Sequence, residues 1–141
     1  MSDYRRADGT PKGRGEVKRT TAASVTRRCL RLWGRIILKR DPVCVVCNKE
    51  PSKHPHHIFP RSRYRHLWFD LRNGAGLCIG DHYAAHFDPV RPVLRYDRHF
   101  GDQFRALVAD ALTGRRRNPY GKKELLGIEV ALKAALEEKE G

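Results

Sequence analysis

The segment Gly76–Asp88, GLCIGDHYAAHFD, sets one cysteine, one aspartate and two histidines within nine residues. Thiolates, imidazoles and carboxylates are the groups with which proteins hold transition metals. The part IGDHYAAHF predicts a short helix, and on a helix His82 and His86 project from one face because they are four residues apart. The segment therefore predicts a short helix that carries metal ligands.

A cysteine pair earlier in the chain supplies the other half of a metal site. In CVVC, Cys44 and Cys47 have the spacing with which two thiolates on a tight turn share one tetrahedral ion. Cys78 adds a third thiolate, and Asp81 stands where a second C-x-x-C would end. Zinc accepts carboxylate oxygen, so we expect one structural zinc on these four residues. Two alternatives stay open: Cys29 or water as the fourth ligand, or no zinc and four cysteines that act as small buried hydrophobes.

Further donors lie between these two segments. PHHIFPRSR and LRNGAGLC are typical of two short extended segments, with Asn-Gly as turn chemistry, so a hairpin is expected before the helix. Neighbouring residues on a strand point to opposite sides, so His56 and His57 are expected to have different roles. A purely structural second zinc site on His56, His82 and His86 is an alternative. The remaining histidines are interpreted as bystanders: His54, His66 and His99.

Composition bounds the class of protein. With 141 residues, 40% of them hydrophobic, the chain can build one modest core with appendages. The net charge of +13 and the pI of about 10.1 indicate a polyanionic partner, nucleic acid first. No apolar run approaches a membrane span and the N-terminus lacks a secretory signal, so we expect a cytoplasmic protein without a membrane partner. In a reducing compartment, C-x-x-C indicates metal rather than disulfides.

The pattern along the chain predicts an α+β protein in four parts. Residues 1–23 are expected to be a flexible basic arm, and residues 24–43 a basic amphipathic helix that ends before Pro42. Residues 44–100 hold the donors, and residues 101–141 form a helical extension. Helices are expected there from Phe100 to Leu112 and from Lys122 to Lys139. The second has an apolar stripe that must dock on the core or on a second copy, as in a homodimer: Leu125, Ile128, Leu132 and Leu136.

Basic residues concentrate at the start of the chain and around the donors. Residues 1–43 hold twelve Lys and Arg against four Asp and Glu, a net charge of +8. Phosphate contact is the functional interpretation, and a solvated helix face with a basic tail is the alternative. The candidate nucleic-acid-binding residues are Arg27, Arg28, Arg31, Arg35, Arg61, Arg63, Arg65 and Arg72. The aromatic residues Tyr64, Trp68 and Phe69 are expected to pack beneath the hairpin.

The order and spacing of HHIFPRS, LRNGAGLC and DHYAAHF resemble the HNH endonuclease, or ββα-metal, motif in the zinc-knuckle form common in phage and bacterial genomes. The resemblance covers Cys44 to Asp88, about a third of the chain, and the flanks resemble small phage-type HNH proteins far more loosely. It implies that His57 is the general base and that Asn73 pins the hairpin and orients His57. It implies one divalent ion on His56, His82 and His86, and a structural zinc on Cys44, Cys47 and Cys78. Asp81 departs from the family, which usually has cysteine there.

The function expected from these residues is metal-dependent hydrolysis of DNA. One catalytic Mg²⁺, Mn²⁺, Ni²⁺ or Zn²⁺ would neutralise phosphate charge while a neutral histidine takes a proton from water. No base-reading element is identifiable, so nicking or double-strand cleavage of low sequence specificity is expected, in phage or host recombination, replication or packaging. The alternatives are a nucleic-acid-binding zinc module without nuclease activity, and RNA cleavage.

Overall fold

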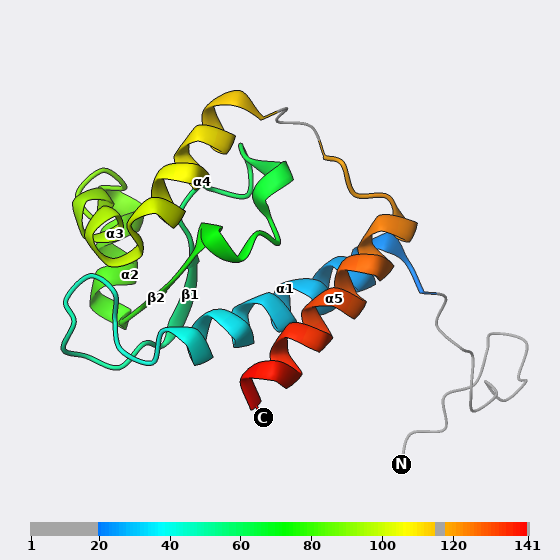
Figure 1. Cartoon of the computed structure of the whole chain (residues 1–141), viewed down its shortest axis with the longest axis horizontal. Coiled ribbons are helices and arrows are strands. Elements are labelled where there is room, and N and C mark those ends of the chain that lie inside the picture. The colour runs from blue at the N-terminus through cyan, green and yellow to red at the C-terminus, as the bar shows by residue number, and fades with distance from the viewer. Residues whose placement is uncertain (1–19, 115–117, 141) are drawn as a thin grey trace, which may run out of the picture.

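The computed structural model describes residues 20–114 and 118–140. These residues form helices around one two-stranded antiparallel sheet, so the predicted α+β class is confirmed. No helix among them has the length and apolarity needed to cross a bilayer. In chain order (Figure 1) the elements are α1 (Ala22–Arg40), β1 (His54–His57), the 3-10 turns η1 (Arg65–Leu67) and η2 (Leu71–Asn73), β2 (Gly74–Leu77), α2 (Ile79–Phe87), α3 (Val93–Phe100), α4 (Asp102–Thr113) and α5 (Lys122–Glu140).

Helix α1 begins with a reciprocal cap. The Thr21 side chain accepts a hydrogen bond from the Ser24 amide, and the Ser24 hydroxyl accepts one from the Thr21 amide. The helix ends at Arg40, ahead of Pro42, as the sequence predicts. Residues 1–19 of the predicted basic arm lie outside the described residues, and Ala22 at its end already belongs to α1.

Helix α5 lies along α1. Its buried Leu125, Leu132 and Leu136 join Val25 and Trp33 of α1 in one apolar cluster, and Figure 1 shows the two helices side by side. The predicted apolar stripe therefore docks on a helix of its own chain. A homodimer through α5 would have to use the opposite face of that helix, and stays a prediction.

An ion pair fixes the α1–α5 contact at one point. Arg28 donates from Nε to the carboxylate of Glu129 at 2.6 Å. Glu129 is buried, and the pKa of its carboxyl lies below its usual range because Arg28 donates hydrogen bonds to it.

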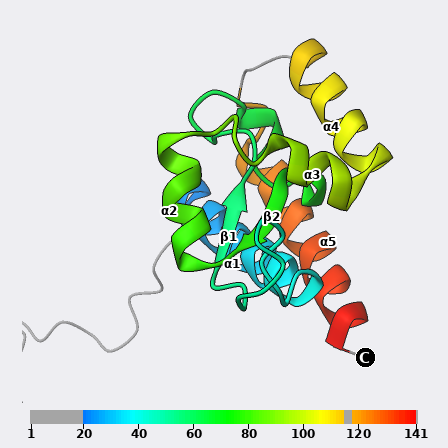
Figure 2. The same cartoon turned by 90° about the vertical axis from the view of Figure 1, so that its left-hand side faces the viewer.

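The sheet lies between two helices. Strands β1 and β2 pair antiparallel, with His54 opposite Leu77 and His57 opposite Gly74. Helices α1 and α2 both contact the two strands. The His57 ring stacks on Trp33 of α1, whereas the His56 ring meets His82 of α2, so the helices cover opposite faces (Figures 1 and 2).

Strand β2 approaches α1 and the segment after it closely enough to require glycine. A methyl group at Gly74 would overlap Ile37 and Trp33 of α1. A methyl group at Gly76 would lie 2.8 Å from the backbone oxygen of Asp41. Asp41 is itself buried and accepts a hydrogen bond from the Gly76 amide at 2.9 Å. The sequence GAG is therefore what lets β2 lie directly on α1.

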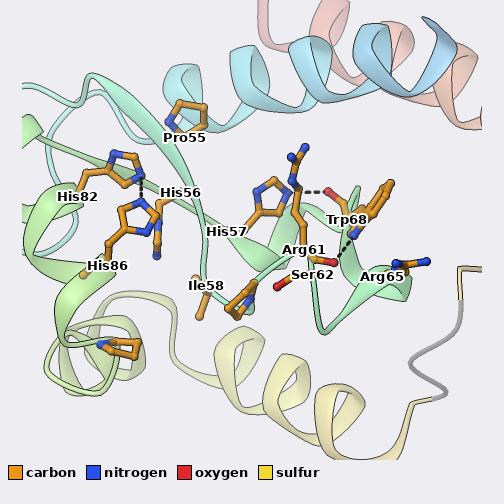
Figure 3. Close-up of a pocket in the computed structure, with 13 residues that line it drawn as sticks. Pro55, His56, His57, Ile58, Arg61, Ser62, Arg65, Trp68, His82 and His86 are labelled. Atoms are coloured by element: carbon orange, nitrogen blue, oxygen red, sulfur yellow. Dashed lines mark hydrogen bonds between the residues drawn. The ribbon is translucent and has the colours of Figure 1, made fainter. Parts of the chain in front are cut away.

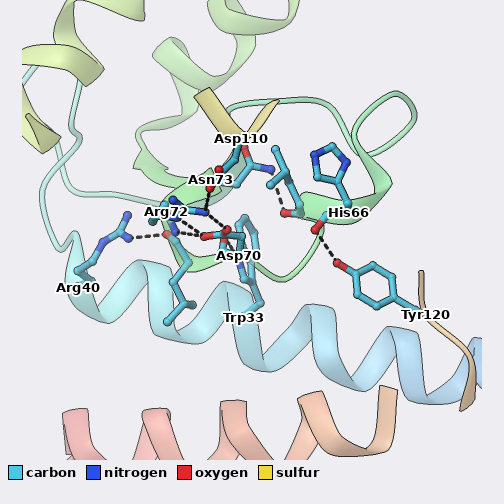
Figure 4. Close-up of polar contacts among 10 residues, drawn as sticks. Trp33, Arg40, His66, Asp70, Arg72, Asn73, Asp110 and Tyr120 are labelled. Carbon is cyan, nitrogen blue, oxygen red and sulfur yellow. Dashed lines mark hydrogen bonds and ion pairs between the residues drawn. The ribbon is translucent and has the colours of Figure 1, made fainter. Parts of the chain in front are cut away.

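A polar network ties the segment before β2 to α1 and α4 (Figure 4). Arg40 donates to the carbonyls of Leu71 at 2.7 Å and Gly74 at 2.6 Å. Arg72 bridges Asp70 at 2.7 Å and Asp110 of α4 at 2.6 Å. These bonds satisfy backbone and charged groups that the close packing removes from water.

The connection between the strands differs from the prediction. The Asn73-Gly74 pair does not form a hairpin turn: Asn73 ends η2 and Gly74 begins β2, with residues 58–73 as the connection. Pro89 and Pro92 lie in a turn, as the sequence predicts, but helix α3, which follows from Val93, was not predicted. Gly101, at φ 60°, separates α3 from α4. Helix α4 corresponds to the helix predicted from Phe100 to Leu112.

The close approach of β2 predicts a glycine-specific effect on stability. Gly76→Ala is expected to lower the free energy of unfolding by roughly 1–3 kcal/mol, because a backbone oxygen cannot rotate away from the added methyl group. Denaturant titration would measure it. The matched control is Gly127→Ala in α5, where a methyl group meets nothing within 4 Å and helix propensity favours alanine. An equal change in the free energy of unfolding in the two variants would show that close packing does not require glycine at position 76.

Candidate metal sites and cleft

Four side chains gather where α2 begins. Cys78 caps the helix by accepting a hydrogen bond from the Asp81 amide, which turns the Asp81 side chain towards the CVVC turn. The Asp81 carboxylate lies 3.2 Å from the sulfurs of both Cys44 and Cys78. One ligand atom from each of Cys44, Cys47, Cys78 and Asp81 lies within 4.8 Å of the others, so this knuckle cluster could hold a metal ion. Cys29 lies elsewhere, in α1, where its thiol contacts the Leu125 carbonyl.

The protonation of the knuckle cluster is set by burial and by its own hydrogen bonds. Burial raises the pKa of the Cys44 and Cys78 thiols. Burial also opposes ionisation of Asp81, but hydrogen bonds from the thiols outweigh it and lower the pKa of the carboxyl. A bound metal would replace the thiol protons, so metal binding and proton release are linked at this cluster.

Three histidines form a second cluster between β1 and α2. Ligand nitrogens of His56, His82 and His86 lie within 4.8 Å of one another. The Nε2 atoms of His82 and His86 are 3.1 Å apart, close to the ~3.3 Å between two ligands of a tetrahedral ion with metal–nitrogen bonds of about 2.0 Å. This histidine cluster could therefore hold a divalent ion.

Burial favours the ligand form of two members of the histidine cluster, His56 and His82. Burial, and then the nearby His82 and His86, lower the pKa of His56 to about 4. Burial also lowers the pKa of His82. Neutral imidazole is the form that donates a lone pair to a metal.

His57 lies on the other face of β1. Its ring stacks on Trp33, with centroids 3.9 Å apart and planes 10° from parallel. Its Nε2 lies 2.9 Å from the carbonyl oxygen of Trp68. A carbonyl only accepts, so Nε2 carries the proton and Nδ1 the lone pair. Burial lowers the pKa of His57 to about 4 in spite of the bond to Trp68, so the ring is neutral at physiological pH.

Asn73 acts on the connection between the strands. It is fully buried, accepts from the Phe59 amide at 2.8 Å, and donates to the carbonyls of Phe59 and Leu67 at 3.1 Å. The sequence resemblance implied that Asn73 orients His57, but the ring nitrogen of His57 is bonded to the Trp68 carbonyl instead. Asn73 holds Leu67, the residue before Trp68, so it fixes that carbonyl and affects His57 only through it.

One cleft joins these groups. A cavity of ≈ 570 Å³ is lined by His56, His82 and His86 at one end and by His57 farther along (Figure 3). Arg61, Ser62 and Arg65 from the connection complete a polar wall. The cleft therefore places a candidate metal site, a neutral histidine with a free lone pair and cationic side chains around one space.

The eight predicted nucleic-acid-binding arginines fall into different environments. Arg61 and Arg65 line the cleft, and Arg63 is exposed on the same connection. On α1, three are exposed: Arg27, Arg31 and Arg35. The other two are engaged within the chain, Arg28 with Glu129 and Arg72 with Asp70 and Asp110.

Three contributions to the site were missed in the sequence. Trp33 was predicted only as a residue of the amphipathic helix over residues 24–43, and the Trp68 carbonyl has no side-chain signal at all. The Trp68 ring packs against the α1–α5 cluster and lines the cleft, and its ring nitrogen donates to the Arg61 carbonyl at 2.7 Å. His54 stacks on His82 with centroids 4.8 Å apart. The alternation of strand residues, which puts His54 on the face of His56, could have indicated this contact.

Comparison with protein-family models, with curated proteins and with solved structures gave no match. The geometry of the site is therefore the basis on which its function is inferred.

The knuckle cluster predicts one tightly bound zinc per chain. Cys78→Ser is expected to weaken zinc binding more than about tenfold, because it removes a ligand and even outer contacts of metal sites contribute tenfold or more. Asp81→Cys is expected to strengthen it. Chelator competition with elemental analysis would measure both, and His56→Ala is the control because it alters only the histidine cluster. Unchanged zinc content in Cys78→Ser would contradict the assignment.

Proposed function

We propose that this chain is a divalent-metal-dependent endonuclease of the HNH type that hydrolyses phosphodiester bonds in DNA. The observation that carries the proposal is the cleft itself. It is lined both by the histidine cluster and by His57, the neutral histidine that follows His56 in the sequence. The strand–strand–helix arrangement of β1, β2 and α2 agrees with the ββα-metal motif that the sequence resembles.

Hydrolysis of a phosphodiester requires a proton acceptor for water, charge neutralisation at phosphorus and stabilisation of the departing oxygen. In this proposal Nδ1 of His57 accepts the proton, while the Trp68 carbonyl and the Trp33 ring keep the imidazole in one tautomer and one orientation. A divalent ion on His56, His82 and His86 would supply charge neutralisation at the phosphate and at the departing oxygen. Arg61 and Arg65 would bind phosphates that flank the scissile bond.

The low pKa of His57 makes its lone pair available to accept a proton, but it also makes the ring a weaker base. At pH 7 the ring is fully neutral, so its lone pair is available without prior deprotonation. A group with a pKa of about 4 is a weak base in the free protein, and a phosphate brought into the cleft would raise that pKa by adding negative charge.

In this proposal, the knuckle cluster has a structural role. A zinc on Cys44, Cys47, Cys78 and Asp81 would link the CVVC turn to the first turn of α2, and so would fix the helix that presents His82 and His86. Asp81 and His82 are adjacent, so the two metal sites would share one short helix.

Loss of the proposed base tests the function. His57→Ala is expected to lower the rate of plasmid cleavage in Mg²⁺ or Mn²⁺ by about 10²- to 10⁴-fold. Binding of DNA is expected to change little, because the arginines of the cleft remain. His57→Gln, which keeps more of the ring's volume against Trp33, controls for packing, and His99→Ala, exposed on α3, controls for loss of a histidine. Cleavage by His57→Ala and His57→Gln at the parent rate would refute the proposal, and salt-dependent binding without cleavage by the parent would favour a binding module.

The arginines give a separate prediction about affinity. Arg61→Ala is expected to reduce the slope of log K against log salt by about 1, because one phosphate contact is lost and one counterion fewer is released. Arg72→Ala is expected to leave that slope unchanged and to lower the free energy of unfolding, because Asp70 and Asp110 lose their partner. Fluorescence anisotropy over a salt series would measure the slopes. A larger slope change in Arg72→Ala than in Arg61→Ala would reverse the assignment.

A further inference from the structure

Helix α2 has an exposed apolar stripe that neither metal cluster uses. Ile79, Tyr83 and Phe87 lie four residues apart, and their exposed fractions are 66%, 67% and 73%. The rings of Tyr83 and Phe87 contact each other with centroids 4.8 Å apart. Core packing does not explain this outer stripe, because the buried side of α2 is the one that carries Ala85. A contiguous exposed apolar face on a helix that also carries a candidate metal site indicates an interaction surface.

The outer stripe adjoins the histidine cluster by helix geometry. Tyr83 follows His82 and Phe87 follows His86, so each aromatic residue lies about 100° around the helix from a cluster histidine. A helix with its side chains is only about 10 Å across. A chain molecule bound at the cleft can therefore extend around the helix to the two rings.

We propose that Tyr83 and Phe87 stack on unpaired nucleotide bases next to the phosphate at the histidine cluster, so that the substrate is single-stranded or has a single-stranded branch. The inference rests on the proposed function and adds the class of substrate. A duplex keeps its base faces stacked inside, whereas an unpaired strand offers them to aromatic rings.

Charge and area favour this occupant over a protein. The neighbouring cleft carries Arg61 and Arg65, and the chain has a net charge of +13, which complements a phosphate backbone. Three side chains of at most about 250 Å² each cannot supply the roughly 800 Å² per partner of a stable protein interface once the faces turned to the helix are excluded. A single nucleotide base, by contrast, can stack on one aromatic ring.

The test compares a single strand carrying 2-aminopurine with a duplex of the same sequence, without added Mg²⁺ or Mn²⁺. Phe87→Ala and Tyr83→Ala are expected to weaken single-strand affinity about tenfold each and to remove the quenching of 2-aminopurine, while duplex affinity is unchanged. Phe87→Trp is expected to retain both, and Phe87→Leu to lose both, since stacking needs a ring. Leu112→Ala, an equally exposed apolar residue on α4, is the matched control and is expected to match the parent.

Three results would overturn the inference. These are single-strand affinity retained by Phe87→Leu, equal loss of affinity for both probes in Phe87→Ala, and a dimer of the parent that Phe87→Ala dissociates in sedimentation. Each leaves the nuclease proposal intact if plasmid cleavage still depends on His57. If plasmid cleavage did not depend on His57, the nuclease proposal would be refuted. The quenching of 2-aminopurine would still test whether bases stack on Tyr83 and Phe87.

Discussion

The alternation of side chains along β1 is the constraint on which the candidate site depends. Because β1 is covered by α1 on one face and by α2 on the other, adjacent histidines enter different environments. His56 joins the candidate metal ligands His82 and His86, whereas His57 stacks on Trp33 and is bonded to a carbonyl. A shift of one residue in the pairing with β2 would exchange the two. The glycine-only fit of β2 on α1, and the bonds from Arg40 and Asp41 to β2, oppose such a shift.

A two-stranded sheet of this size is marginal without support. Here α1 supplies one apolar surface, itself backed by α5, and the knuckle cluster ties the start of α2 to the CVVC turn. The candidate ligands His82 and His86 are therefore positioned by α2 and His56 by β1, whereas His57 is positioned by α1 and by the connection that Asn73 holds. The cleft lies where the part supported by the knuckle cluster meets the part supported by α1 and α5.

The parts of the site that could be predicted from the sequence depend on short-range patterns. The spacing of Cys44 and Cys47, the i, i+4 pair on α2 and the opposite orientation of His56 and His57 follow from local geometry, and all three are present in the structure. The same holds for the placement of Asp81 beside the cysteines.

The parts that could not be predicted depend on backbone groups or on partners distant in sequence. The Trp68 carbonyl that holds His57 leaves no trace in the choice of side chains, since any residue has a carbonyl. Arg72 was predicted to bind phosphate, but it pairs with Asp70 and also with Asp110, which lies 38 residues away. Helix α3 was missed because the turn at Pro89 and Pro92 was not expected to lead directly into a helix, although the fixed φ of proline suits the start of a helix.

The pairing of α1 with α5 has a consequence for how the molecule assembles. Arg28 and Glu129 are 101 residues apart, so forming this contact carries the entropic cost of closing a long loop. The α1–α5 contact is therefore expected to form late in folding. During synthesis the ribosome releases all seven candidate ligands, from Cys44 to His86, before any residue of α5. If the clusters bind metal ions, the growing chain could bind them while the surface that supports Trp33 is still incomplete, and the order of translation would separate metal binding from completion of the cleft.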